Sequence, residues 1–180
     1  MDMLEILATA TRQCVEEVFT TMLGSEVSAD PAQVEAQAAE PNNGVVSFIG
    51  IAGSWAGTGS IVCSPAMACK VCTQMLMAET TMVNEDVFDA MAELTNMIVG
   101  GVKTEIEKHV GPLGLSIPTV VFGRNFKTKS AGNTQWNVER FRWNEEEFVV
   151  KICLEQNQAH SHATAQPLGQ TCPIEVKPLI

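Results

Sequence analysis

The sequence predicts an α+β domain in which helices pack on an antiparallel six-stranded sheet. Three segments carry the hydrophobic spacing of helices, and six shorter segments carry strand patterns. Their order along the chain is one helix, three strands, two helices and three strands. This order indicates an antiparallel α+β domain. We therefore expect two long central helices packed side by side on the sheet, plus an N-terminal helix.

The first part of the chain predicts one helix followed by three strands. Residues 2–23 keep apolar side chains at helical spacing, and Gly24 stands at the C-terminal position that favours glycine. Turn-forming residues separate the segments that follow, for example at 41–44 and at 53–54. The predicted strands cover 34–38, 45–52 and 55–63.

Two helices are predicted in the middle of the chain. The first, at 64–78, has a proline in its first turn and is apolar nearly all round, so we expect it to be buried. The second, at 86–110, is the longest helical pattern in the sequence. Asn84 is its candidate N-cap, and Gly111 with Pro112 ends it.

The 86–110 helix has one apolar and one polar side. The apolar side is expected to face the core, and the polar side to meet water or a partner. On the polar side, Glu93 offers a fixed negative charge, and Asn96 offers an amide that both donates and accepts hydrogen bonds. The apolar side consists of Val87, Met91, Leu94, Ile98, Val102 and Ile106, and the polar side of Asp89, Glu93, Asn96, Gly100, Lys103 and Glu107.

Two glycines, Gly100 and Gly101, lie in the middle of this helix, where each costs about 1 kcal/mol relative to alanine. One interpretation is that they allow the helix to pack closely on a neighbour. The other is that Gly100 keeps the surface bare, so that another molecule can approach Glu93 and Asn96. The hydrophobic periodicity does not decide between these interpretations.

The second half of the chain returns to strands. After residue 155 the sequence becomes polar and loses its pattern, which is typical of a tail. We therefore expect one domain at 1–155 and a polar C-terminal tail at 156–180. The predicted strands cover 116–123, with 128 as an alternative end, 134–143 and 147–155, with a hairpin turn at 144–145 and a further short strand in the tail at 174–177.

The composition excludes some classes of function. A formal net charge of −10 at pH 7 opposes binding to nucleic acids and to anionic membranes, and it favours partners that are basic where they dock. No stretch approaches the roughly 20 apolar residues of a membrane span. The N-terminus lacks the features of a signal peptide. We therefore expect a cytoplasmic protein that binds neither nucleic acid nor membrane.

The cysteines are expected to be reduced and to serve mostly as small apolar core residues. Cys69 and Cys72 form a C-x-x-C pair, but no second pair completes a zinc site, and His160 and His162 lie in the polar tail. Metal binding is therefore the weaker alternative, and we expect no metal and no cofactor bound by this chain. The six cysteines are Cys14, Cys63, Cys69, Cys72, Cys153 and Cys172.

The long helix carries a spaced set of polar residues that leads to a known family. Glu93 follows Asp89 by four positions, Asn96 follows Glu93 by three, and Pro118 comes farther along. This arrangement resembles the signature of the CheX/CheC/FliY phosphatases of bacterial chemotaxis, in which the proline comes one residue later. The similarity extends over residues 1–155. The surrounding residues are E-L-T-N-M-I-V-G-G-V-K at 93–103 and L-S-I-P-T-V-V-F-G at 115–123.

The resemblance implies a CheC/CheX-like fold and one site. The helix at 64–78 contains no E-x-x-N, which is similar to the single-site CheX type rather than the two-site CheC type. The resemblance also implies a two-fold homodimer formed by pairing of sheet edges. The alternative is a monomer whose edges are blunted by charge.

Members of this family hydrolyse the aspartyl phosphate of CheY-like response regulators. The resemblance implies that Glu93 and Asn96 are the catalytic pair: Asn96 orients the attacking water, and Glu93 docks to the regulator's lysine. Asp89, Gly100 and Lys103 are implied to help dock the partner. Mg²⁺ is expected in the partner response regulator, because phosphoryl transfer needs positive charge near the phosphoryl oxygens.

An alternative function is a non-catalytic binding module of the same fold, in a chemotaxis or flagellar-switch-type assembly. An unrelated enzyme is a third and weaker alternative. The presence of both Glu93 and Asn96 favours the phosphatase, because a scaffold does not need that pair. Release of phosphate from phosphorylated CheY-type domains would distinguish these possibilities.

Overall fold

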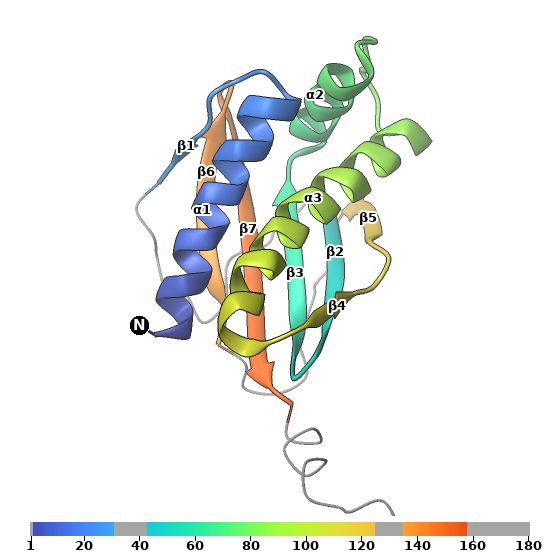
Figure 1. Cartoon of the computed structure of the whole chain (residues 1–180). Coiled ribbons are helices and arrows are strands. Elements are labelled where there is room, and N and C mark those ends of the chain that lie inside the picture. The colour runs from blue at the N-terminus through green and yellow to red at the C-terminus, as the bar shows by residue number, and fades with distance from the viewer. Residues whose placement is uncertain (1, 31–42, 125–134, 158–180) are drawn as a thin grey trace, which may run out of the picture.

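The computed structural model describes residues 2–30, 43–124 and 135–157. In these ranges the chain forms three helices and a seven-stranded antiparallel sheet, and the helices lie on one face of that sheet (Figure 1). The predicted α+β class is confirmed. The helices are α1 (Met3–Met22), α2 (Pro65–Leu76) and α3 (Glu85–Val110); the strands are β1 (Ser28–Ala29), β2 (Asn43–Gly53), β3 (Trp55–Cys63), β4 (Leu113–Leu115), β5 (Thr119–Arg124), β6 (Asn137–Trp143) and β7 (Glu146–Gln156).

The strands follow the order β1-β6-β7-β3-β2-β4, and β5 pairs with β2 beyond the end of β4. Hairpins join β2 to β3 and β6 to β7. The β6–β7 turn falls on Asn144 and Glu145, whose φ angles of 46° and 67° are those of a tight hairpin turn. The predicted turn at 144–145 is therefore confirmed. The β2–β3 turn contains Gly53, whose φ of 152° disfavours other residues.

Local residues mark the end of α1 and the starts of α2 and α3. Gly24, just after α1, has a φ of +59°. At the start of α2, the Ser64 hydroxyl accepts a hydrogen bond from the backbone N–H of Met67 at 3.0 Å. At the start of α3, the Asn84 side chain accepts one from the N–H of Val87 at 3.1 Å. The predicted Asn84 cap and the predicted glycine at the end of α1 are thus confirmed, and the Ser64 cap is a finding of the structure.

The core lies between the helices and the sheet, and α3 supplies its centre. Every residue of the predicted apolar side of α3 is fully buried, so the predicted orientation of the helix is confirmed. Within the described ranges, none of the helices has the length and apolarity needed to cross a membrane. The buried residues in question are Val87, Met91, Leu94, Ile98, Val102 and Ile106.

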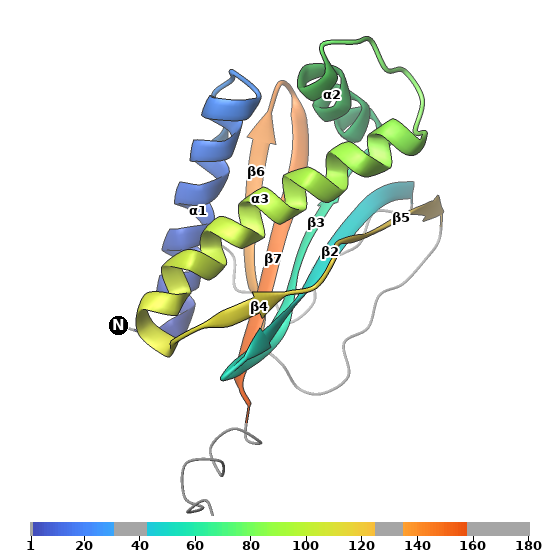
Figure 2. The same ribbon diagram turned by 45° about the vertical axis from the view of Figure 1, so that its right-hand side comes forward.

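Helix α3 runs diagonally over the sheet and contacts both other helices (Figure 2). Its predicted contact with α2 is present, but its contact with α1 is more extensive. Two glycines permit α3 to pack closely, one against β3 and one against α1. A Cβ atom at Gly59 of β3 would lie 2.7 Å from the Val99 methyl carbons, and one at Gly101 would lie 2.8 Å from the Cys14 sulfur.

The prediction of six strands needs a correction in detail. Five of the six are present, as β2, β3, β5, β6 and β7. The predicted strand at 34–38, the alternative end at 128 and the strand at 174–177 lie outside the described residues. β1 and β4 are additional strands of two and three residues. They are too short to show an alternating pattern, so only their pairing reveals them.

The prediction of a fully buried second helix is wrong at its C-terminal end. Its earlier turns are buried, for example at Met67 and Val71. The helix ends at Leu76, which is 53% exposed, and the next residue, Met77, is 92% exposed. Met77 has a φ of 55°, a left-handed conformation that stops the helix. The apolar pattern at this end therefore does not indicate burial.

Candidate functional site

The polar side of α3 provides one wall of the candidate site. Asp89, Glu93 and Asn96 are exposed, whereas Leu94, between Glu93 and Asn96, is buried. In the part of the chain that the structure describes, no hydrogen bond or ion pair occupies the side chains of Glu93 or Asn96. Their carboxylate and amide are therefore available to a partner.

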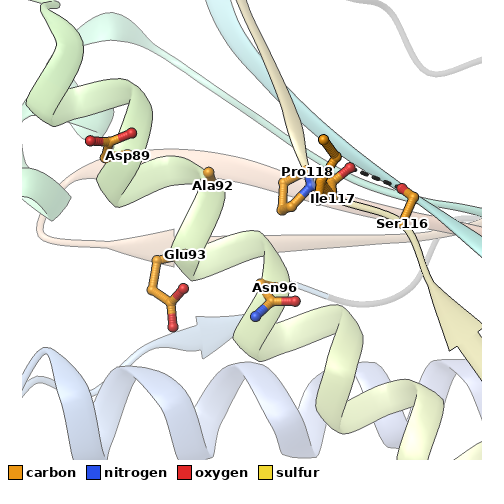
Figure 3. Close-up of a pocket in the computed structure, with 7 residues that line it drawn as sticks. All are labelled: Asp89, Ala92, Glu93, Asn96, Ser116, Ile117 and Pro118. Carbon is orange, nitrogen blue, oxygen red and sulfur yellow. Dashed lines mark hydrogen bonds between the residues drawn. The ribbon is translucent and has the colours of Figure 1, made fainter.

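The second wall is the segment 116–118, which connects β4 to β5. It lies beside α3, and together the two walls enclose an open pocket of about 560 Å³ (Figure 3). The pocket brings together two groups of residues that are twenty or more positions apart in the sequence. Its lining consists of Asp89, Ala92, Glu93 and Asn96 from α3, with Ser116, Ile117 and Pro118 from the connection.

The predicted strand at 116–123 is wrong at 116–118, because this segment interrupts the edge of the sheet. Pro118 has no N–H to donate, and it restricts the residue before it. Ser116 replaces the missing strand pairing: its N–H donates to the Gly50 carbonyl at 2.9 Å, and its hydroxyl accepts from the Gly50 N–H at 2.9 Å. Regular pairing with β2 resumes at Thr119.

Pro118 lies in the same pocket as Glu93 and Asn96, although its sequence spacing is one residue shorter than in the family signature. Sequence reasoning did not identify three lining residues, Ser116, Ile117 and Ala92. The first two are the sequence neighbours of Pro118. Ala92 lies four residues before Asn96, so helical spacing could have placed it on the same side.

Gly100 and Lys103 do not line the pocket. Lys103 pairs with Glu107 at 2.8 Å, and the Glu107 carboxylate also accepts the N–H of Leu113 at 2.7 Å. The Leu113 N–H, followed by Lys103, holds the pKa of Glu107 below its usual value. Among the described residues, a Cβ atom at Gly100 would meet only the Leu115 methyl carbon, at 3.8 Å. These contacts join the end of α3 to β4, and docking by Gly100 and Lys103 stays a prediction.

The cysteines of the described ranges are free and buried. Burial raises the pKa of Cys63 to about 12 and that of Cys14 to about 11. These environments favour the interpretation of the thiols as packing residues. Cys172, His160 and His162 lie outside the described residues. Among the residues that are described, no group of three or more His, Cys, Asp or Glu is placed to hold a metal.

Several solved structures share this fold. CheX from Vibrio vulnificus has 22% identity and a TM-score of 0.74, covering 83% of this chain and 99% of that one. A CheC-like superfamily protein from Shewanella sp. PV-4 has 22% identity and a TM-score of 0.75, covering 86% and 99%. CheX from Borrelia burgdorferi, crystallised in a complex with CheY, BeF₃ and Mg²⁺, has 20% identity and a TM-score of 0.66, covering 85% and 97%.

The fold is therefore the one found in CheX and CheC-like proteins. A family model described as chemotaxis phosphatase CheX matches residues 45–140, which is more than half of the chain's 180 residues. The chain belongs to the CheX family of chemotaxis phosphatases. No curated protein sequence matches it significantly.

Proposed function

We propose that this protein hydrolyses the aspartyl phosphate of a CheY-like response regulator. The observation that carries the proposal is that Glu93 and Asn96, which are exposed and have no partner among the described residues, line one pocket with Pro118 in a CheX-family chain. The complex of Borrelia burgdorferi CheX with CheY supports a regulator as the partner. BeF₃ bound to a carboxylate stands in for a phosphoryl group, so that complex represents a phosphorylated partner.

Asn96 is the proposed catalytic residue that orients water. Its amide oxygen accepts a hydrogen bond from the water and its NH₂ group can donate one, so the amide fixes both position and direction. Orientation is a large part of what phosphoryl transfer requires, because the attacking oxygen must lie in line with the bond that breaks. The exposed position of Asn96 on a rigid helix suits this task.

Glu93 is proposed to pair with a lysine of the regulator and so to set the register of the complex. It is one helical turn before Asn96, and its carboxylate has no cationic partner within the described ranges. Asp89, one further turn away in the same pocket, adds negative charge to this docking side. A cationic group on the regulator would therefore meet two carboxylates as it approaches.

The proposed reaction balances without a nucleophile from this chain. The oriented water attacks phosphorus, the bond between phosphorus and the aspartyl oxygen breaks, and the aspartate regains its carboxylate. The water oxygen and both of its protons leave in inorganic phosphate as H₂PO₄⁻, which then exchanges protons with solvent. Mg²⁺, which we expect the regulator to hold, would neutralise charge on the phosphoryl oxygens.

The test is phosphate release from a CheY-type receiver domain charged with acetyl phosphate and Mg²⁺, with and without this protein. We expect the wild-type protein to accelerate release. Asn96→Ala should lower the rate by about 10²-fold or more while binding persists, because only the positioned amide is lost. Folding should be intact, since Asn96 is exposed and alanine is the better helix former.

Thr104→Ala is the matched control, because it removes an exposed polar side chain from α3 outside the pocket. It should dephosphorylate the receiver at the wild-type rate. A well-folded Asn96→Ala variant with full activity would refute the role of the amide. A wild-type protein that binds the phosphorylated receiver without accelerating release would instead be a binding module of the same fold.

A further inference from the structure

The connection between β4 and β5 presents one exposed apolar side chain at the pocket. Ile117 is 85% exposed and lines the same pocket as Glu93 and Asn96 (Figure 3). A single exposed apolar residue is ordinary on a protein surface. Ile117 differs because it borders the two proposed functional side chains.

The backbone holds Ile117 in place without help from its own side chain. The N–H of Ser116 donates to the Gly50 carbonyl, and the Ser116 hydroxyl accepts from the Gly50 N–H, both at 2.9 Å. The same hydroxyl donates to the Ile117 carbonyl at 2.9 Å. Pro118 fixes its own φ and favours an extended conformation at Ile117. An exposed apolar group that is already ordered loses little entropy when it is covered.

The substrate's size determines what meets Ile117. The proposed aspartyl phosphate is part of a folded receiver domain, whereas the pocket is an open depression between α3 and 116–118. Asn96 can reach the phosphoryl group only if the receiver surface contacts the residues around the pocket. The receiver would then meet carboxylates on the α3 side and Ile117 on the other side. Contacts on both sides would hold the receiver over the pocket and add to the affinity of the complex.

We propose that Ile117 is a docking residue that packs on an apolar patch beside the regulator's phosphorylated aspartate, and that Ser116 is the positioning residue that holds it there. This inference rests on the proposed function. It adds to that function an apolar contact opposite the acidic side, which determines affinity for the regulator rather than the chemical step.

Affinity and turnover are measured separately to test this. Binding is measured with a CheY-type receiver domain activated by beryllofluoride and Mg²⁺, and turnover with the same domain charged by acetyl phosphate. Ile117→Ala should weaken binding about tenfold and raise KM similarly, because most of the apolar contact is lost. Its kcat should stay near the wild-type value. Ile117→Leu should restore binding to within about threefold, because it keeps the apolar volume.

Ser116→Ala tests the positioning role. It removes the acceptor for the Gly50 N–H, so it should raise Kd and KM several-fold while kcat changes little. Ser116→Thr keeps the hydroxyl and should restore both values. A purely structural serine would lower the melting temperature without changing Kd. Met22→Ala is the control: Met22 is a 52% exposed apolar residue on α1 that does not line the pocket, and its loss should leave Kd unchanged.

The outcomes separate this inference from the proposed function. If wild-type protein releases phosphate but Ile117→Ala binds as tightly as wild type, the docking role is wrong and the phosphatase stands. If binding depends on Ile117 but the wild-type protein does not accelerate phosphate release, the docking role stands and the catalytic proposal fails. If wild-type protein does not bind the activated receiver at all, both are overturned.

Discussion

The two neighbouring glycines of α3 have different surroundings. A Cβ atom at Gly101 would lie 2.8 Å from the Cys14 sulfur, whereas one at Gly100 would make only an ordinary contact, 3.8 Å from Leu115. Close packing therefore explains Gly101. Gly100 meets no such steric requirement among the described residues, and the interpretation that it keeps the surface bare for a partner stays a prediction.

Alanine substitution at each glycine tests, through the free energy of unfolding, which of the two is required for close packing. Gly101→Ala should lower the free energy of unfolding by about 1–2 kcal/mol, because α1 must shift to make room. Gly100→Ala should raise it by up to about 1 kcal/mol, because alanine is the better helix former. Urea denaturation measures both. Adding Cys14→Ala to Gly101→Ala should recover part of the loss, and a loss that is merely additive would contradict the proposed clash.

Glu93 yields a prediction about binding rather than folding. If its carboxylate forms a desolvated ion pair with the regulator's lysine, Glu93→Gln should weaken binding of the activated receiver by about 2–5 kcal/mol. If it is only a solvated surface charge, the loss should stay below about 1 kcal/mol. Titration calorimetry on a CheY-type receiver decides this. Unchanged binding and unchanged kcat/KM would leave Glu93 without the docking role.

At the scale of elements, a small polar cluster fixes α2 to the β6–β7 hairpin. The Ser64 hydroxyl caps the helix and donates to the Glu146 carboxylate at 2.8 Å, and Lys70 pairs with the same carboxylate at 2.8 Å. The Lys70 ammonium, followed by the Ser64 hydroxyl, holds the pKa of Glu146 below its usual value. The position of α2 therefore depends partly on an ionised carboxylate.

This cluster predicts a pH dependence of stability. Because the pKa of Glu146 is lowered on folding, its contribution is present above the unfolded value of 4.5 and is lost as pH falls below it. Glu146→Gln should cost about 0.5–1 kcal/mol at pH 7, and the difference from wild type should shrink as pH falls from 7 through the lowered pKa of Glu146 in the folded protein. Denaturant unfolding across this range measures it. A constant difference at every pH would show that the ionised carboxylate is not responsible.

Glu147→Gln is the matched control for that experiment. Glu147 is the next residue along β7, and its pair with Arg142 is exposed on both sides, with 67% and 56% of the two side chains accessible. An exposed pair contributes little to stability because solvent screens it. We therefore expect Glu147→Gln to change the free energy of unfolding by only a few tenths of a kcal/mol at pH 7.

At the scale of the whole molecule, the described sheet ends at β1 on one side and at β4 with β5 on the other. β5 is an edge strand of six residues, with Val121 and Phe122 38% and 45% exposed. An edge strand of this kind can pair with a second copy. The homodimer therefore stays a prediction, with β5 as the more extended of the two edges.

The homodimer can be tested by light scattering coupled to size exclusion at tens of micromolar protein. We expect a mass near twice the 19.4 kDa of one chain. Val121→Lys should favour the monomer if β5 is the paired edge, because an added lysine protects an edge strand. A monomer mass for the wild-type protein at these concentrations would contradict the prediction.

The sequence by itself determined the helices, the buried side of α3 and most of the strands. Capping by Ser64 and Asn84, the turn at 144–145 and the 3.6-residue spacing all act within a few residues, so a local pattern encodes them. The same spacing placed Asp89, Glu93 and Asn96 on one exposed side. Their roles in catalysis and docking stay predictions.

Only the tertiary structure decided what faces those residues. The second wall of the pocket depends on hydrogen bonds between Gly50 and Ser116, which are 66 positions apart. No local pattern specifies which strand edge a distant segment joins, because pairing is set by the sheet as a whole. The sequence pattern therefore predicted a strand through 116–118. In the structure, regular pairing with β2 stops after β4 and resumes at β5, and the segment between them places Ile117 and Pro118 at the pocket.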